Sequence, residues 1–254
     1  MYHFFVEPSQ VHADEIEILG GDVNHIRNVL RMKEGEEILI HDGYGSEYRS
    51  RIDRFGEDAV YAAVMEKRRV ASELPSKITL FQCLPKGDKM ELIIQKAVEL
   101  GASAVVPVAS RRCVVKLDAR KEISKLRRWQ AIAESAAKQS GRAVIPEVAP
   151  VVPFSEALLR AQGAEVLLLP YECAGELLED GCKSAMQRSR ETLAGIVRGQ
   201  SVGILIGPEG GFEKSEAEAA VQAGAQMISL GRRILRTETA GLCVLSVLMF
   251  QMEE

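Results

Sequence analysis

The stretch "LIGPEGGFEKSE", residues 205–216, connects a strand-like apolar run to a helix-like run through three glycines and a proline. Such turns often hold phosphate, because backbone N–H groups and the helix dipole point at the ligand. The phosphate-loop pattern needs a glycine six residues before its lysine and another directly before it. For Lys214 those positions are Pro208 and Glu213, and the spaced three-glycine dinucleotide pattern is also absent. The turn therefore predicts no ATP, GTP or NAD site.

A ligand with a flat base and little negative charge fits this turn better. Its glycines, Gly207, Gly210 and Gly211, let backbone groups approach closely because no Cβ intervenes. Pro208 stiffens the turn, and the carboxylate of Glu209 suits a cation. Glu209 and Glu213 are both expected to repel a polyphosphate. S-adenosylmethionine, which carries an adenine and a sulfonium but no phosphate, matches these properties. The alternative is a tight strand-to-helix turn with only a capping role, and the turn alone leaves both open.

A second segment, "LGRRILRTETAG" at residues 230–241, places Arg232, Arg233 and Arg236 within five residues. Arginines beside a strand end, in a chain that is acidic overall, indicate an anionic partner, or else a solvated loop. Thr237 or Thr239 is expected to cap the helix that follows.

The elements that must position these residues alternate between strands and helices after residue 77, which predicts a parallel sheet covered on both faces. The expected strands are 77–83, 104–109, 165–170, 201–207 and 226–230, and the expected helices are 90–100, 120–140, 154–161, 184–197, 213–223 and 237–252. Ligands of such sheets bind beyond the carboxyl ends of the strands. Three of these ends carry unusual residues, at 167–172, 205–212 and 229–241.

The first 70 residues contain four short β-rich segments, at 2–6, 36–43, 47–55 and 58–67, which predict a small β-barrel interrupted by one helix, Asp22 to Met32. A polar, proline-containing stretch, "KRRVASELPSK" at 67–77, is typical of a linker. We therefore expect two domains, residues 1–70 and residues 71–254.

Composition is that of a globular protein, with 46% hydrophobic residues, 27% charged residues and a net charge of −4. A protein that coats nucleic acid is usually basic. Residues 111–128, however, hold eight basic side chains against Asp118 and Glu122. This cluster indicates a local grip on a phosphate backbone, or else a solvated helix face.

The remaining composition sets limits on location and metal content. The longest apolar stretch, Ala240 to Phe250, is about half of what spans a bilayer, and the N-terminus lacks the pattern of a signal peptide, so a cytoplasmic protein is expected. The five cysteines are scattered and are expected to be reduced and mostly buried. All four histidines lie in the first 41 residues without metal-ligand spacing, which predicts no metal site.

With these motifs in view, the whole chain resembles the RsmE family of ribosomal RNA methyltransferases, in the SPOUT superfamily. The resemblance rests on "LIGPEGGF" with "LGRRILRTETA", and it extends to residues 25–43, 85–115 and 129–142. One departure is "ASRRCVV", where an acidic residue is expected before the basic one, so the role of Arg111 is left open while Arg112 is assigned to RNA.

The resemblance implies methylation by S-adenosylmethionine of one uridine, at ring N3, in 16S rRNA or the small ribosomal subunit. It also implies an α/β domain with a trefoil-knotted parallel sheet, a PUA-like N-terminal barrel and a homodimer. The helix at 237–252 is apolar nearly all round, which supports burial on more than one side and hence the dimer.

By the same resemblance, the cofactor lies against three loops, where backbone groups read the adenine edge without adding charge. The implied cofactor-binding residues are Leu169, Pro170, Gly207, Pro208, Glu209, Gly210, Leu230, Gly231, Ile234, Leu235 and Thr239.

Methyl transfer to N3 requires loss of the N3 proton, which makes the uracil anionic. A positioned guanidinium stabilises such charge, and Arg236 is the first candidate. Arginine does not deprotonate, so it is not the base. Glu209 or Glu238 is expected either to take the proton, directly or through water, or to have a structural role.

The expected RNA contacts are basic residues of both domains, which position a phosphate backbone without reading its sequence. They are Arg27, Arg31 and Lys33 in the barrel, and Arg112, Lys116, Arg127, Arg128 and Arg142 in the catalytic domain. Trp129 is expected to stack on a base or to belong to the core. The rival functions are another SPOUT methyltransferase, acting on tRNA or a ribose hydroxyl, and an RNA-binding module without activity.

Overall fold

The computed structural model describes residues 1–69, 72–171 and 184–253 of the chain. The chain divides into two compact units. One comprises Met1–Glu73 with Ala137–Ile145, and the other comprises Leu74–Ala136 with Pro146–Glu254.

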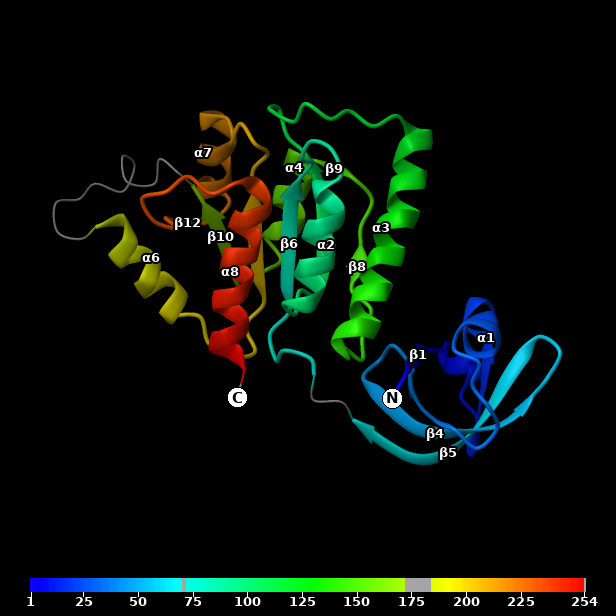
Figure 1. Cartoon of the computed structure of the whole chain (residues 1–254). Helices are drawn as coiled ribbons and strands as arrows, with labels where there is room; N and C mark the ends of the chain where they lie inside the picture. Colours follow the sequence, from blue (N-terminus) through cyan, green and yellow to red (C-terminus); the bar gives the residue numbers. More distant parts are fainter. Residues whose placement is uncertain (70–71, 172–183, 254) are drawn as a thin grey trace. The chain divides into compact units, whose positions relative to one another are not determined.

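The N-terminal unit is built on a curled five-stranded sheet in the order β1-β3-β4-β5-β2 (Figure 1). Its strands are β1 (His3–Phe5), β2 (Glu15–Leu19), β3 (Glu37–His41), β4 (Ser46–Phe55) and β5 (Ala59–Arg69). Alternate residues point into one core, as the buried Ile16, Ile18, Ile38 and Ile40 show. The β-rich prediction for residues 1–70 matches four of these strands. It missed β2, a short strand that lies at one edge of the sheet.

The expected helix from Asp22 to Met32 is shorter and of two kinds. An α-helical turn, α1 (Gly21–Asn24), leads into a π-helical turn (His25–Val29). Arg31, in the left-handed conformation at φ 53°, ends the segment, and the Met32 N–H closes it on the carbonyl of Ile26 at 3.0 Å. A non-glycine residue at this position is uncommon, and helical spacing alone gives no warning of it.

The second unit is built on a parallel sheet in the order β12-β10-β11-β6-β7-β8, with β9 also paired to β7. The strands are β6 (Ile78–Cys83), β7 (Ala104–Ala109), β8 (Glu147–Val148), β9 (Val152–Pro153), β10 (Val166–Pro170), β11 (Val202–Ile206) and β12 (Gln226–Ile228). Every residue of β11 is buried, as expected of a parallel strand covered on both faces. The α/β architecture and the five predicted strands are confirmed; the two-residue strands β8 and β9 carried no readable pattern.

The helices follow the strands as the sequence predicts. They are α2 (Lys89–Glu99), α3 (Ala119–Ser140), α4 (Phe154–Ala161), α6 (Ala185–Ala194), α7 (Lys214–Gln222) and α8 (Thr237–Met252). Helices α2 and α8 pack against each other in front of the sheet in Figure 1, and α4 packs behind it on β7 and β9.

Two open assignments concern buried side chains. Trp129 is only 3% exposed, so it belongs to the core and is not a base-stacking platform. Cys83 and Cys113 are buried free thiols, and Cys243 is a half-buried one. Cys173 and Cys182 lie outside the described residues. In the part of the chain that the structure describes, no helix combines the length and apolarity needed to cross a bilayer.

Candidate active site

The three segments singled out in the sequence line one cavity of about 360 Å³. They follow β10, β11 and β12, which are neighbours in the sheet, so their carboxyl ends meet at one edge. The volume lies within the roughly 300–1,000 Å³ of small-molecule sites. The parallel sheet therefore brings together residues about 65 positions apart at its usual place for a ligand.

The glycine turn folds tightly back on itself in front of this cavity. The Gly211 N–H donates to the Pro208 carbonyl at 2.9 Å. A Cβ on Gly207 would lie 3.2 Å from the backbone carbonyl carbon of Gly211 and from the nitrogen of Phe212. A glycine is thus favoured at position 207, because a Cβ there would press on backbone, which moves aside less easily than a side chain.

The first turn of α7, directly after the glycine turn, is already filled by carboxylates. Glu216 is 5% exposed; its Oε2 accepts the Glu213 N–H at 3.0 Å and its Oε1 accepts the Arg111 N–H at 2.9 Å. A helix start capped by its own acidic residue offers no anion site. This capping gives a structural reason for the expectation that the turn does not bind phosphate.

The charge expectation for the cavity needs correction. Glu213 pairs with the guanidinium of Arg111 at 3.2 Å and does not line the cavity. Among the described residues, the lining carries one carboxylate, that of Glu209, and four basic side chains, Lys89, Arg232, Arg233 and Arg236. This described part of the lining is therefore basic, which suits an anionic reactant.

The arginine-rich loop is held to the glycine turn by Thr237, the first residue of α8. Its hydroxyl donates to the Gly207 carbonyl at 2.6 Å and accepts from Nε2 of Gln82 on β6 at 2.9 Å. Arg236 is the residue before the helix, and no side chain caps it. The expected capping by Thr237 or Thr239 is therefore wrong: Thr237 joins two loops instead.

Lys89, at the start of α2, is a site residue that sequence reasoning missed. Its ammonium lies 3.3 Å from Glu209 Oε1 and 3.1 Å from Glu238 Oε2. The carboxylate of Glu238, and then that of Glu209, raises the pKa of Lys89 above its ordinary value. Lys89 reaches the site because β6 pairs in parallel with β11, which sets the loop before α2 beside the glycine turn. The sequence gives no sign of a strand pairing across this distance.

The two candidate proton acceptors thus share one cation. Burial acts to raise the pKa of Glu209, but the Lys86 N–H at 2.9 Å and the Lys89 ammonium outweigh it, so the pKa is lowered. A carboxylate so stabilised is a weaker base. Glu238 does not line the cavity and touches it only through Lys89. This arrangement favours a positioning role for both carboxylates.

Arg236 lines the cavity with its side chain exposed. It forms no ion pair or hydrogen bond through its guanidinium with any residue in the described ranges. It is available to an anionic group that enters the cavity.

Eight of the predicted cofactor residues line the cavity and three do not. The eight are Pro170, Gly207, Pro208, Glu209, Leu230, Gly231, Ile234 and Leu235. Leu169 is fully buried in β10, and Thr239 is exposed on α8. The Gly210 carbonyl faces away, accepting from Arg112 Nη1 at 2.9 Å.

The predicted RNA contacts separate into exposed and structural groups. Arg31, Lys33, Arg112, Lys116, Arg127 and Arg128 are exposed, and Arg128 also pairs with Glu91 at 2.7 Å. Arg27 donates instead to the backbone carbonyls of Gly56, Glu57 and Ala59. Arg142 is 4% exposed and pairs with Glu73, so no phosphate can reach it in this structure.

Comparisons with known proteins agree with this geometry. A family model described as "RNA methyltransferase domain" matches residues 72–249, and one described as "RNA methyltransferase PUA domain" matches residues 18–64. The protein named ribosomal RNA small subunit methyltransferase E in Bacillus subtilis (strain 168) is 38% identical over 256 residues, which span 100% of this chain and 98% of the relative.

Two solved structures with bound S-adenosylmethionine share the fold. One is a ribosomal RNA small subunit methyltransferase E from Neisseria gonorrhoeae, 31% identical, with a TM-score of 0.81, covering 99% of this chain and 98% of its own. The other is a putative methyltransferase from Legionella pneumophila, 30% identical, with a TM-score of 0.81, covering 98% and 97%.

Proposed function

The chain belongs to the ribosomal RNA small subunit methyltransferase E family, and from this premise we propose that it transfers the methyl group of S-adenosylmethionine to N3 of one uridine in 16S rRNA. The observation that carries the proposal is the cavity itself. It combines a glycine turn unsuited to phosphate with the guanidinium of Arg236, which has no partner among the described residues.

The residues of the cavity fit the methyl donor on three grounds. Gly207 keeps the turn backbone close to the cavity, where a Cβ would press on the backbone of Gly211 and Phe212. The loop from Leu230 to Leu235 lines the cavity and supplies backbone groups for a neutral base. Glu209, the one acidic group among the described lining residues, suits the positive charge of a sulfonium compound. The donor supplies the methyl group when it is bound.

The chain's own residues act on the uracil. The N3 proton passes to a water molecule, which leaves negative charge on the ring, and the guanidinium of Arg236 stabilises that charge as it develops. Lys89 pairs with Glu209 and Glu238 and holds both carboxylates in place, so neither competes for Arg236. The target base must leave any stack before its N3 can enter.

The six exposed basic residues are the proposed RNA contacts, Arg31 and Lys33 in the N-terminal unit and Arg112, Lys116, Arg127 and Arg128 in the second. Phosphate contacts of this kind position the RNA and leave base selection to the cavity. A closed PUA-like barrel is proposed for the N-terminal unit, in keeping with the curled sheet and the PUA family match. Action on rRNA makes the cytoplasm the expected location.

A homodimer through α8 is part of the proposal. The helix buries Gly241, Val244, Leu245 and Leu248 on the sheet side, yet its outer face still exposes Phe250 at 83% and Val247 at 42%. An apolar outer face of this kind is typical of a helix that a second subunit covers. The trefoil knot is proposed from the family membership. It is supported by the path of the chain, which runs from the edge strand β12 back to α8, where that helix packs on β11.

The decisive experiment maps modified nucleosides in small-subunit rRNA by mass spectrometry, in cells with and without this protein. We expect one N3-methyluridine to disappear with the protein and to return with the unaltered chain, but not with Arg236→Ala. Loss of a 2′-O-methyl ribose or of a tRNA methylation instead would select the rival SPOUT activities. Calorimetry with S-adenosylmethionine separates the enzyme from an RNA-binding module, since the module would release no heat.

A further inference from the structure

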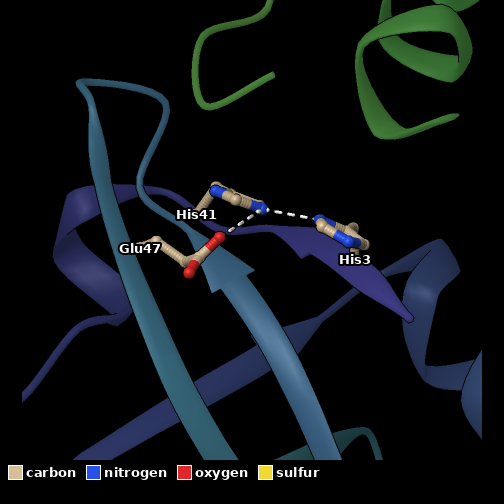
Figure 2. A group of neighbouring side chains, drawn as sticks. All are labelled: His3, His41 and Glu47. Atoms are coloured by element: carbon tan, nitrogen blue, oxygen red, sulfur yellow. Dashed lines mark hydrogen bonds and ion pairs between the residues drawn. The ribbon is translucent and has the colours of Figure 1, made fainter. Parts of the chain in front are cut away.

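Three strands of the N-terminal unit bring two histidines and a glutamate to one face of its sheet. In the antiparallel pair of β3 and β4, His41 lies directly opposite Glu47. In the parallel pair of β1 and β3, His41 is the partner of Phe5, and His3 lies two residues earlier on the same face. Figure 2 shows the three side chains pointing toward one another.

The nitrogen and oxygen atoms of this group converge on one point. His3 Nδ1 lies 2.9 Å from His41 Nε2, and Glu47 Oε2 lies 3.9 Å from the same Nε2 (Figure 2). One ligand atom from each residue fits within 4.8 Å of the other two. His41 is fully buried and Glu47 is 4% exposed, whereas His3 is half-buried and leaves one side open to solvent.

Both imidazoles are in the form that binds metal. Burial, and then the charge of His3, lowers the pKa of His41 to about 4, and burial also lowers the pKa of His3. Neutral imidazole nitrogens and an ionised carboxylate are the states required of metal ligands. Both imidazoles are therefore uncharged near neutral pH, and each presents a nitrogen lone pair to a metal that displaces the hydrogen between them.

We propose that His3, His41 and Glu47 form a zinc site, a function separate from methyl transfer. Two imidazoles and a carboxylate suit Zn²⁺, with water as the fourth ligand on the open side of His3. Tetrahedral bonds of about 2.0–2.1 Å separate ligand atoms by roughly 3.3 Å. The two nitrogens, 2.9 Å apart, need to separate slightly, and Glu47 Oε2, 3.9 Å from His41 Nε2, needs to move closer.

The carboxylate is already oriented for this role. Glu47 Oε1 accepts a hydrogen bond from Nε of Arg68, which leaves Oε2 directed at His41. Such outer hydrogen bonds commonly fix the ligands of a metal. The spacing of the histidines along the chain predicted no metal site, because the ligands lie on three strands that meet only in the folded sheet.

A metal here would fasten β1, a strand of three residues, to β3 and β4. Among the described strands it pairs with β3 alone, at the edge of the sheet. Metal binding to the folded state alone raises its stability in proportion to the logarithm of the free metal concentration. Excess Zn²⁺ is therefore expected to raise the unfolding temperature of the full-length protein.

The test uses the full chain with a C-terminal tag that contains no histidine, since an N-terminal tag would sit two residues from His3. After treatment with a chelator, Zn²⁺ is titrated in competition with a chromophoric chelator, and Co²⁺ is added separately as a spectroscopic probe. We expect one Zn²⁺ per chain, and the intense visible absorption of four-coordinate Co²⁺.

Two variants and one control locate the site. His3→Ala and Glu47→Gln should each weaken Zn²⁺ binding at least tenfold, whereas His12→Ala, an exposed histidine of the same unit, should leave it unchanged. Equal binding by all three variants would overturn the proposal, as would an unaltered chain that binds no Zn²⁺ and shows only a proton-sharing histidine pair. The Co²⁺ spectrum of the unaltered chain keeps the test decisive if a variant folds poorly.

Discussion

At the scale of single residues, the cavity divides its charged groups into paired and unpaired ones. Lys89 is held between Glu209 and Glu238, whereas Arg236 has no partner in the described ranges. A paired group is already stabilised and gains little from a ligand; an unpaired guanidinium gains most where negative charge develops. This difference assigns the substrate contact to Arg236 and the positioning of the loops to Lys89.

Arg236→Ala is expected to keep the affinity for S-adenosylmethionine within about tenfold and to lose most turnover. Loss of one group that stabilises developing negative charge costs about 2–4 kcal/mol, or roughly 30- to 1,000-fold in rate. Single-turnover rates with small-subunit RNA, together with calorimetry for the cofactor, measure the two effects separately. Unchanged turnover would remove Arg236 from the mechanism.

Lys89→Met is expected to destabilise the protein more at neutral than at acidic pH. The lowered pKa of Glu209 means that its ionised form stabilises the fold, a contribution present above the unfolded-state pKa and lost as the pH falls through the folded-state pKa. Without the Lys89 cation this contribution shrinks. The unfolding temperatures of the variant and of the unaltered protein should therefore differ most at neutral pH and come closer together as the pH falls through the folded-state pKa of Glu209.

Lys86→Met is the matched control for Lys89→Met, since it removes the same charge but keeps the backbone N–H that Glu209 accepts. Its unfolding temperature should follow that of the unaltered protein at every pH. A difference for Lys89→Met that stays constant from pH 7 to pH 3 would show that Lys89 does not act through these carboxylates.

At the scale of elements, apolar runs and turn residues were enough to predict the strands and helices of the second unit. The runs at 77–83 and 201–207 become β6 and β11 almost residue for residue. The sequence does not show that these strands are neighbours, because their pairing joins residues more than a hundred positions apart. The cofactor loops could be predicted because their motifs are local. Lys89, Glu216 and the three-strand histidine group could not, because their positions depend on this long-range pairing.

Gly207→Ala is expected to damage the glycine turn, because the new Cβ would press on backbone at 3.2 Å. Overpacking of this kind costs about 1–3 kcal/mol. Gly210→Ala is the matched control, since its Cβ would meet only side-chain atoms of Arg112 at 3.8 Å. Thermal unfolding and cofactor calorimetry should show a loss for the first variant and little change for the second; equal effects would mean that the tight backbone turn is not what the cofactor requires.

At the scale of the whole molecule, a net charge of −4 coexists with local basic surfaces. Several members of the basic cluster at 111–128 are paired, as Arg128 is with Glu91, and others such as Arg127 and Lys116 are exposed without a described ion pair. The RNA proposal therefore depends on a few free side chains within an otherwise acidic protein. The contribution of these side chains to RNA binding can be measured from the salt dependence of the RNA affinity.

Arg127→Ala is expected to weaken RNA binding and to reduce the slope of log affinity against log salt by about 0.7–0.9, the value of one lost phosphate contact. Arg190→Ala, an exposed arginine on α6 outside the cluster, serves as the control and should leave the slope unchanged. Filter binding of small-subunit RNA at several salt concentrations gives both slopes. An unaltered slope for Arg127→Ala would show that this side chain touches no phosphate.

Phe250→Glu on α8 is expected to weaken the proposed homodimer at least tenfold, about 1.4 kcal/mol, because it would bury a charge between two apolar helices. Leu159→Glu on α4, an exposed apolar residue with a similar change, should leave the assembly intact. Light scattering across a dilution series measures the mass. A monomeric unaltered protein, or equal dissociation of both variants, would argue against α8 as the interface.

The hydrogen bond from Arg112 to the Gly210 carbonyl connects a proposed RNA contact to the glycine turn beside the cofactor cavity. A phosphate that takes this guanidinium for itself removes a donor from the glycine turn. Conversely, when the cofactor is bound and Arg112 stays hydrogen-bonded to Gly210, its guanidinium is less available to an RNA phosphate. If this hydrogen bond contributes to cofactor affinity, linkage requires RNA and cofactor to alter each other's affinity by the same factor, a heterotropic effect transmitted by one shared side chain.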